Sequence, residues 1–358
     1  MARLKATAFC SAVLLLLLHG ANAVLAQTPA KLPQGVTTTP APGPRVLVRY
    51  DMEGLAGEDN WRMSAVWWPE QYAVGQKLLA EDVNAVVAGL FDGGASVVDV
   101  WDQHGSGSRN FNLPPALLDP RARHIHRTDA PRVESGAYDA VAMVGMHAKT
   151  GSGGFMAHTG TFGIEMIVNG RSITETEFSG YFWGEVGIPV VFVSGDDRLR
   201  DDLLPVMPWL EYVVSKHSVS PQVVELRPVA MVRRELREGA KRALERRANA
   251  MPLRVGRPVR ATLHAVPPAD LSALKDIPGI NYADEQVSFE APSWEETWRG
   301  LVALQEIASA FGGQPIIEEI LKRDPGWTQI ERTREAGFWE RWMELETERA
   351  KNTVAPRR

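Results

Sequence analysis

Short apolar runs alternate with longer stretches of helical periodicity over the first two thirds of the chain. Four of these runs, residues 45–50, 96–101, 138–146 and 189–194, are bounded by turn residues and predict buried strands. Between the first two, residues 69–90 carry leucines and valines at three- and four-residue spacings, which predict a helix. Helices that alternate with strands indicate an α/β fold, with a largely parallel sheet sandwiched by helices.

Two further elements belong to the same part of the chain. Residues 163–174 predict a hairpin, because Asn169-Gly170 is a dipeptide preferred in a tight two-residue turn. Residues 175–186 predict a helix after this hairpin. We therefore expect one α/β domain over residues 45–225.

The last third of the chain has a different character. A basic helix is predicted over residues 229–250, where arginines interleave with glutamates in the manner of a solvated face. A strand over residues 260–266 and a helix over residues 293–311 follow. These elements predict a smaller α+β C-terminal region over 226–312, and the tryptophan-bearing, charged segment 313–358 predicts a helical tail.

The N-terminus has the pattern of a cleavable secretory signal. Arg3 and Lys5 precede a short apolar run that ends in small-residue cleavage sites, of which the one after Ala26 is favoured. We expect residues 1–26 to be the signal peptide and residues 27–44 to be a Pro/Thr-rich linker. Polar residues interrupt the apolar run, so no stable membrane anchor is expected. A periplasmic or secreted location is predicted.

Composition narrows the chemistry and the partners. Cys10 is the only cysteine and lies inside the predicted signal, so the mature chain has neither disulfides nor thiolate metal ligands. Removal of Arg3 and Lys5 with the signal changes the formal charge from −5 to −7. An acidic chain of this kind argues against nucleic acid as a partner.

Acids and imidazoles follow the four predicted strands at the points where the strands end. They are Asp51 and Glu53 after the first strand, Asp102 and His104 after the second, His147 after the third, and Asp196 and Asp197 after the fourth. Because the carboxyl ends of parallel strands meet at one edge of an open α/β sheet, these side chains should converge there. Carboxylates and neutral imidazoles are ligands for zinc or a similar divalent ion, and two such ions share a bridging carboxylate. Metal-assisted hydrolysis is predicted.

Several of these residues are also consistent with ordinary structural roles. Asp51 fits a turn cap, Glu53 and His104 fit solvent-facing positions, and the pair Asp196-Asp197 is typical of a helix N-cap. His158 by itself is a weak signal. The other histidines are expected to be exposed, in the case of His124 and His126, or satisfied structural residues, in the case of His217 and His264.

One ordered set of motifs connects these residues. It consists of DMEG at 51–54, D-x-H at 102–104, G-x-H at 145–147, a Gly-rich loop followed by His158, and GDD at 195–197. In this order the motifs resemble the bacterial D-aminopeptidase family of dinuclear zinc metallopeptidases. The resemblance covers residues 45–312 and is carried by the whole set, since DMEG alone is not specific.

The resemblance implies a role for each residue of the site. The implied metal ligands are Asp51 as the bridge between two zinc ions, Glu53 and His104 on one ion, and His147 and Glu175 on the other. His158 resembles the catalytic histidine. Glu175 is assigned by the resemblance only, and its neighbour Glu177 is the alternative alignment.

The resemblance also implies a substrate and an assembly. Family members remove N-terminal D-residues from short peptides and amides, and form ring-like homo-oligomers such as stacked pentamers, so a decamer is one expectation here. Gln103 replaces a serine that is common at its position, and such departures bear on substrate choice. Carboxylate-rich sites accept Mn²⁺ or Co²⁺ as well as Zn²⁺.

The leading prediction is therefore an exported dinuclear zinc aminopeptidase. Two alternatives stay open at this point. One is a two-metal phosphoesterase, although the chain lacks a G-x-x-x-x-G-K-[ST] phosphate cradle. The other is a non-catalytic metal- or peptide-binding envelope protein.

Overall fold

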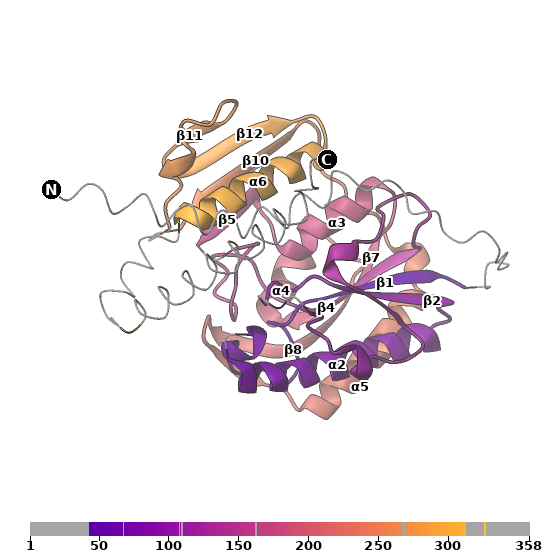
Figure 1. Ribbon diagram of the computed structural model, residues 1–358. Coiled ribbons are helices and arrows are strands. Elements are labelled where there is room, and N and C mark those ends of the chain that lie inside the picture. The colour runs from indigo at the N-terminus through magenta and orange to yellow at the C-terminus, as the bar shows by residue number, and fades with distance from the viewer. Residues whose placement is uncertain are drawn as a thin grey trace, which may run out of the picture.

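The computed structural model describes residues 43–312, apart from positions 67, 107, 109, 162, 267 and 268, together with Gly326 (Figure 1). The predicted signal peptide 1–26, nearly all of the predicted linker 27–44 and nearly all of the predicted tail 313–358 lie outside these residues.

A large, largely parallel sheet forms the centre of the fold, with the strand order β3-β2-β1-β4-β7-β8-β9. Only β9 runs antiparallel to its neighbour. Its strands are β1 (Arg45–Tyr50), β2 (Val97–Asp102), β3 (Arg123–Ile125), β4 (Ala140–Met146), β7 (Val190–Asp196), β8 (Glu211–Ser220) and β9 (Val223–Leu226). The four strands expected from the apolar runs are confirmed, and so is the α/β fold class.

A smaller antiparallel sheet has the order β11-β12-β10-β5-β6. Its strands are β5 (Ile164–Val168), β6 (Arg171–Ser172), β10 (Val259–Ala265), β11 (Asn281–Ala283) and β12 (Gln286–Ala291). The predicted hairpin is confirmed as β5-β6. Asn169 and Gly170 take φ values of 49° and 80°, as the tight turn requires.

Among the described residues, five α-helices cover the two sheets: α2 (Pro69–Asp92), α3 (Glu175–Glu185), α4 (Asp197–Leu203), α5 (Val229–Glu245) and α6 (Trp294–Gly312). The short 3₁₀ turns in the described part of the chain are η2 (Trp61–Ser64), η3 (Pro115–Leu117), η4 (Arg127–Asp129), η5 (Arg247–Asn249) and η6 (Ser272–Leu274). In Figure 1, α2 and α5 lie side by side below the large sheet. On the other side of that sheet, α3 lies toward the smaller sheet and contacts α6, which packs on the smaller sheet. Within the described residues, no helix combines the length and apolar character that crossing a membrane needs.

The division predicted at residue 225 differs from the layout of the two sheets. Hairpin β5-β6 comes from the predicted 45–225 domain, yet it pairs with β10 of the predicted 226–312 region. Helix α5 belongs to the second range, yet it packs on α2 against the large sheet. Burial of apolar side chains explains both placements. Met166 of β5 pairs with Leu263 of β10, and both are almost fully buried. Leu236 of α5 is fully buried in the same core cluster as Leu79 of α2.

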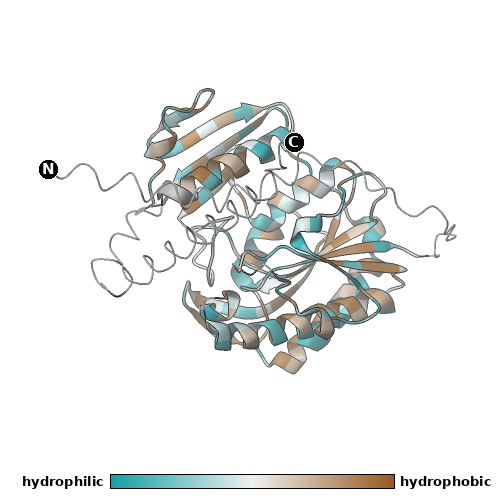
Figure 2. Cartoon of the chain, viewed as in Figure 1, coloured by the Kyte–Doolittle hydropathy of each residue, from teal (hydrophilic) through white to brown (hydrophobic). Residues whose placement is uncertain are grey.

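Side-chain alternation along β1 separates two cores. Val46 and Val48 pack with the residues of α2 and α5, whereas Leu47 packs with those of α3, α6 and the smaller sheet. Figure 2 shows the corresponding hydrophobic strands between flanking helices. Because side chains two residues apart share a face, Arg49 lies on the Leu47 side of the sheet, toward α3.

Candidate metal centre

The carboxyl ends of β1, β2 and β4 are neighbours in the sheet, and they bring four of the predicted ligands together. Asp51, Glu53, His104 and His147 are 5%, 5%, 6% and 1% exposed, so their charges and ring nitrogens face the protein interior. Glu175, the first residue of α3, completes the set. The structure thus places all five predicted ligands in one cluster.

The turn after β1 explains why two acids in alternate positions face the same way. A Cβ on Gly54 would lie 1.9 Å from the backbone oxygen of Met146, so only glycine lets the chain turn this close to β4. Past that strand end, Asp51 Oδ1 and Glu53 Oε2 both accept the Met52 N–H, at 2.9 and 3.1 Å. The Met52 side chain is fully buried in the apolar core.

Each of the three site histidines donates from its outer ring nitrogen to a backbone carbonyl. The pairs are His104 Nε2 with Ser64 at 2.6 Å, His147 Nδ1 with Ala148 at 3.0 Å and His158 Nδ1 with Met156 at 2.6 Å. This hydrogen-bond network assigns the tautomers and directs the other nitrogen of each ring toward the carboxylates. Such a carbonyl partner is the usual support for a metal-binding imidazole.

Three sets of side chains bring their ligand atoms within 4.8 Å of one another. They are Asp51 with Glu53 and His104, Asp51 with His147 and Glu175, and Glu53 with His147 and His158. The first two sets are the two ion sites that the resemblance implies, and Asp51 is the residue that they share.

The surroundings of His147 fit an ion better than a hydrogen bond. Its Nε2 lies 3.7 Å from both Asp51 Oδ2 and Glu175 Oε1, and it is buried without a hydrogen-bond partner among the described residues. Ligands at about 2.0–2.2 Å from a tetrahedral zinc ion are separated by about 3.4 Å. Nitrogen and carboxylate donors at this spacing suit zinc and related divalent ions.

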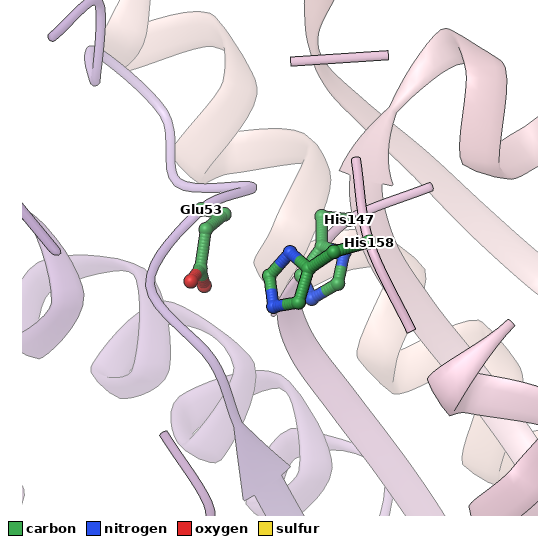
Figure 3. A group of neighbouring side chains, drawn as sticks. All are labelled: Glu53, His147 and His158. Atoms are coloured by element: carbon green, nitrogen blue, oxygen red, sulfur yellow. The ribbon is translucent and has the colours of Figure 1, made fainter. Parts of the chain in front are cut away.

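His158 lies directly against this cluster (Figure 3). Its ring stacks on that of His147, with the ring centroids 4.0 Å apart and the planes inclined by 10°. Its Nε2 lies 3.7 Å from Glu175 Oε1. His158 is therefore within reach of both a metal ion and a substrate held beside it.

The charges of the cluster act strongly on its histidines. Burial disfavours a charged His104, but the charge of Glu53 and the hydrogen bond to Asp51 outweigh it and raise its pKa well above 6.5. Burial likewise opposes charging of His147, yet Glu175 and Glu53 raise its pKa to about 9. Burial and then the neighbouring His147 lower the pKa of His158. The metal-free cluster thus holds protons on His104 and His147, which metal binding must displace.

Glu175 and Glu177 have different roles, although they are only two residues apart. Glu177 is fully buried and forms a capping box with Thr174, whose N–H donates to Glu177 Oε2 at 2.9 Å. Glu175 instead accepts the Gly160 N–H at 2.6 Å and faces His147. The structure therefore favours Glu175 over the alternative alignment.

Other strand-end acids stay outside the cluster. Asp102 is fully buried and accepts hydrogen bonds from the backbone and side-chain nitrogens of Asn112, at 2.8 Å each. Asp196 caps α4 by accepting the Leu199 N–H at 2.8 Å, as the N-cap interpretation predicted. The prediction from strand ends therefore included more acids in the site than the structure brings together.

The expectation that His124 and His126 are exposed was wrong, because both are only partly exposed and β3 places His124 partly inside the fold. His124 Nε2 contacts the Tyr50 hydroxyl at 3.2 Å, and burial lowers the pKa of His124 to about 4. The expectation for His217 and His264 is confirmed. Their Nδ1 atoms lie 3.1 Å from Asp197 and 3.0 Å from Glu165, respectively.

Two cations near the cluster were not expected from the sequence. Lys216 on β8 is fully buried, and its Nζ donates to the Glu53 carbonyl at 2.8 Å and to Glu58 Oε2 at 2.6 Å. Arg49 on β1 is 8% exposed and lies over the Trp101 ring at 5.4 Å. Arg49 follows three apolar residues of a predicted buried strand, and a charge at such a position was the signal in the sequence that could have drawn attention to it.

Comparison with known proteins identifies the family. A family model described as D-aminopeptidase matches residues 45–303, most of the chain. The chain belongs to the D-aminopeptidase family. The predicted family and the predicted enzyme class, a metallopeptidase, are confirmed, which speaks against the phosphoesterase and the non-catalytic binding protein.

Two relatives of this D-aminopeptidase family member come from Bacillus subtilis. A D-aminopeptidase of strain 168 is 27% identical over 273 residues, which cover 74% of this chain and 97% of that protein. A solved structure, the Zn-dependent D-aminopeptidase DppA, described as a self-compartmentalizing protease, matches with a TM-score of 0.68 at 23% identity. That match covers 74% of this chain and 98% of the other, and it supports the same fold.

Proposed function

We propose that the chain is an exported dinuclear zinc aminopeptidase that removes N-terminal D-residues from short peptides or amides. The observation that carries this proposal is the position of Asp51 in two ligand sets at once, one with Glu53 and His104 and the other with His147 and Glu175. A carboxylate shared between two ligand sets is what a two-metal site requires.

The proposed mechanism assigns separate work to the ions and to the chain. Asp51, Glu53, His104, His147 and Glu175 would hold the zinc ions, which when bound would supply a nucleophilic water at neutral pH and polarise the carbonyl of the scissile bond. His158 would accept a proton at its Nε2 and return it to the leaving amine. Burial lowers the pKa of His158, which keeps its imidazole neutral and able to accept a proton, and the Met156 carbonyl fixes the orientation of the ring.

Paired D- and L-aminoacyl anilides and dipeptides, assayed with metal-replete protein, test the activity. We expect cleavage of the D-series at the higher kcat/KM, loss of that activity after chelation, and its return when Zn²⁺, Mn²⁺ or Co²⁺ is restored. An aryl phosphate serves as the control substrate and should not turn over. Absence of cleavage of every aminoacyl substrate would contradict the proposal, and equal rates for both series would contradict its D-specific part.

Export and assembly form a second part of the proposal. Export is supported by the signal-like residues 1–26, and a ring-shaped homo-oligomer by the self-compartmentalizing relative. N-terminal sequencing of the protein recovered from the periplasm should begin at Gln27, and light scattering should give a mass of several subunits. A retained Met1 in the cytoplasm would contradict export, and a monomeric mass would contradict the ring.

A further inference from the structure

A pocket of about 210 Å³ opens beside the candidate metal centre, between the edge of the large sheet and helices α3 and α6. Glu175 lines both this pocket and the metal cluster. Most of the remaining wall is apolar or aromatic, and is formed by Trp101, Met166, Phe178, Phe182, Trp298 and Val302. The volume is below the roughly 300–1,000 Å³ of sites for larger ligands, so it suits a single amino-acid residue.

Arg49 brings a buried positive charge to this pocket. Its side chain forms no hydrogen bond or ion pair within the described part of the chain, and its Nε is buried without a partner. The indole Nε1 of Trp101, the other end of the contact with Arg49, is likewise buried and unpaired among the described residues. Both unpaired groups are donors, so the missing partner is an acceptor.

The nearby acids do not supply this acceptor. Asp51 and Glu175 attract the charge of Arg49, but their oxygens are directed to the metal cluster and form no ion pair with it. In the proposed dinuclear state, three carboxylates do not neutralise two divalent ions, so Arg49 adds to a net positive site. A buried guanidinium without a counter-charge is costly unless a ligand compensates it.

We propose that Arg49 binds a carboxylate of the substrate residue that occupies this pocket, and so selects short peptides that carry a carboxylate next to the scissile bond. This inference rests on the proposed peptidase function and names its substrate class. The planar guanidinium matches a carboxylate through two parallel hydrogen bonds. Gln103, which lines the same pocket, carries an amide that can donate to the same group.

Two sources of the carboxylate are distinguished by matched substrates. One arm compares a dipeptide of neutral residues with its C-terminal amide, and the other compares N-terminal glutamate with glutamine in an amidated dipeptide. The arm that carries the carboxylate bound by Arg49 should show a preference of wild-type, metal-replete protein for the carboxylate substrate over its amide, by about 10- to 150-fold in kcat/KM. This factor corresponds to the free energy that a hydrogen bond to a charged group contributes.

Variants at Arg49 assign this preference to its side chain. Arg49→Met should abolish the preference by slowing the carboxylate substrate, while the matched amide changes by less than about threefold. Arg49→Lys should restore part of it, because the charge remains and the planar fork is lost. Arg45→Met is the control, since Arg45 lies on the same strand face but is exposed and stacks on Tyr138. Equal slowing of both substrates by Arg49→Met, or no carboxylate preference in either arm, would overturn the inference.

A binding measurement separates this inference from the peptidase proposal. Calorimetry with dipeptide analogues that carry a CH₂–NH link in place of the peptide bond needs no turnover. The carboxylate analogue should bind wild type more tightly than its amide, and Arg49→Met should remove the difference while the metal content is unchanged. Failure of all cleavage with this binding difference intact would refute only the peptidase function. Cleavage without any binding difference would refute only the role of Arg49.

Discussion

Replacement of Asp51 by alanine should leave the purified protein with neither metal ion and without measurable peptidase activity. Asp51 is the carboxylate common to both ligand sets, whereas Glu53 belongs to only one of them in the proposed assignment. Loss of an outer-shell partner costs about 10- to 100-fold in metal affinity or activity, so loss of a bridging ligand should cost more than about 100-fold in kcat/KM. Mass spectrometry of bound metal should find close to two ions in the wild type, about one in Glu53→Ala and none in Asp51→Ala.

The matched control is His158→Ala, which should keep both ions and lose turnover. Proton transfer by a positioned side chain contributes about 10²- to 10⁴-fold, so kcat should fall by that factor while the metal content stays at the wild-type level. Loss of an ion in His158→Ala would instead make His158 a ligand, in the set that it forms with Glu53 and His147. Retention of both ions in Asp51→Ala would contradict a bridging role, provided that circular dichroism shows a folded protein.

Local patterns were sufficient to predict the framework of this fold. The buried strands of the large sheet are short apolar runs, and the turn at Asn169-Gly170 has a specific conformational requirement that its residues meet. The edge strand β3 was missed, because residues 123–125 are too short and too polar to show a period. Strand β8 was also missed, since polar residues such as Lys216 and Ser218 occupy buried positions in it.

The candidate site could be predicted in part because a topological rule connects distant residues. Parallel strands end at one edge, and this alone places Asp51, His104 and His147 together. The same rule wrongly included Asp196, since it does not indicate which way a side chain points. Glu175 follows a hairpin rather than a strand of the large sheet, so only the family resemblance could single it out.

The sequence marks Arg49 as a charged residue beside apolar ones, but it could not show what Arg49 and Lys216 do in the folded protein. Lys216 matters because it has a charged partner far away in the chain, and Arg49 matters because its buried Nε has no hydrogen-bond partner among the described residues. Both are properties of the folded structure. Glu58, the partner of Lys216, precedes it by 158 residues. Such pairs carry no local period and no short motif.

Replacement of Lys216 by methionine should destabilise the protein by about 3–5 kcal/mol, because it leaves the buried Glu58 carboxylate without its counter-charge. Both side chains are fully buried, and Lys216 Nζ lies 2.6 Å from Glu58 Oε2. Burial raises the pKa of Glu58 above 4.5, and Lys216 opposes that shift. Without the lysine, the folded-state pKa of Glu58 rises further. The folded variant then binds more protons than the unfolded chain, so its stability falls as pH rises above about 4.5.

Urea unfolding of metal-free wild type and Lys216→Met at pH 5 and pH 7.5 should therefore show the larger deficit at pH 7.5. Lys241→Met is the control, because Lys241 is exposed on α5 and its pair with Glu245 is worth less than about 1 kcal/mol. A double variant that also carries Glu58→Gln should regain most of the lost stability, since no charge is then left buried. It should still bind metal more weakly than the wild type, because Lys216 also holds the Glu53 carbonyl at 2.8 Å. An unchanged free energy of unfolding in Lys216→Met would refute the stabilising role, and wild-type metal affinity in the double variant would refute the positioning of Glu53.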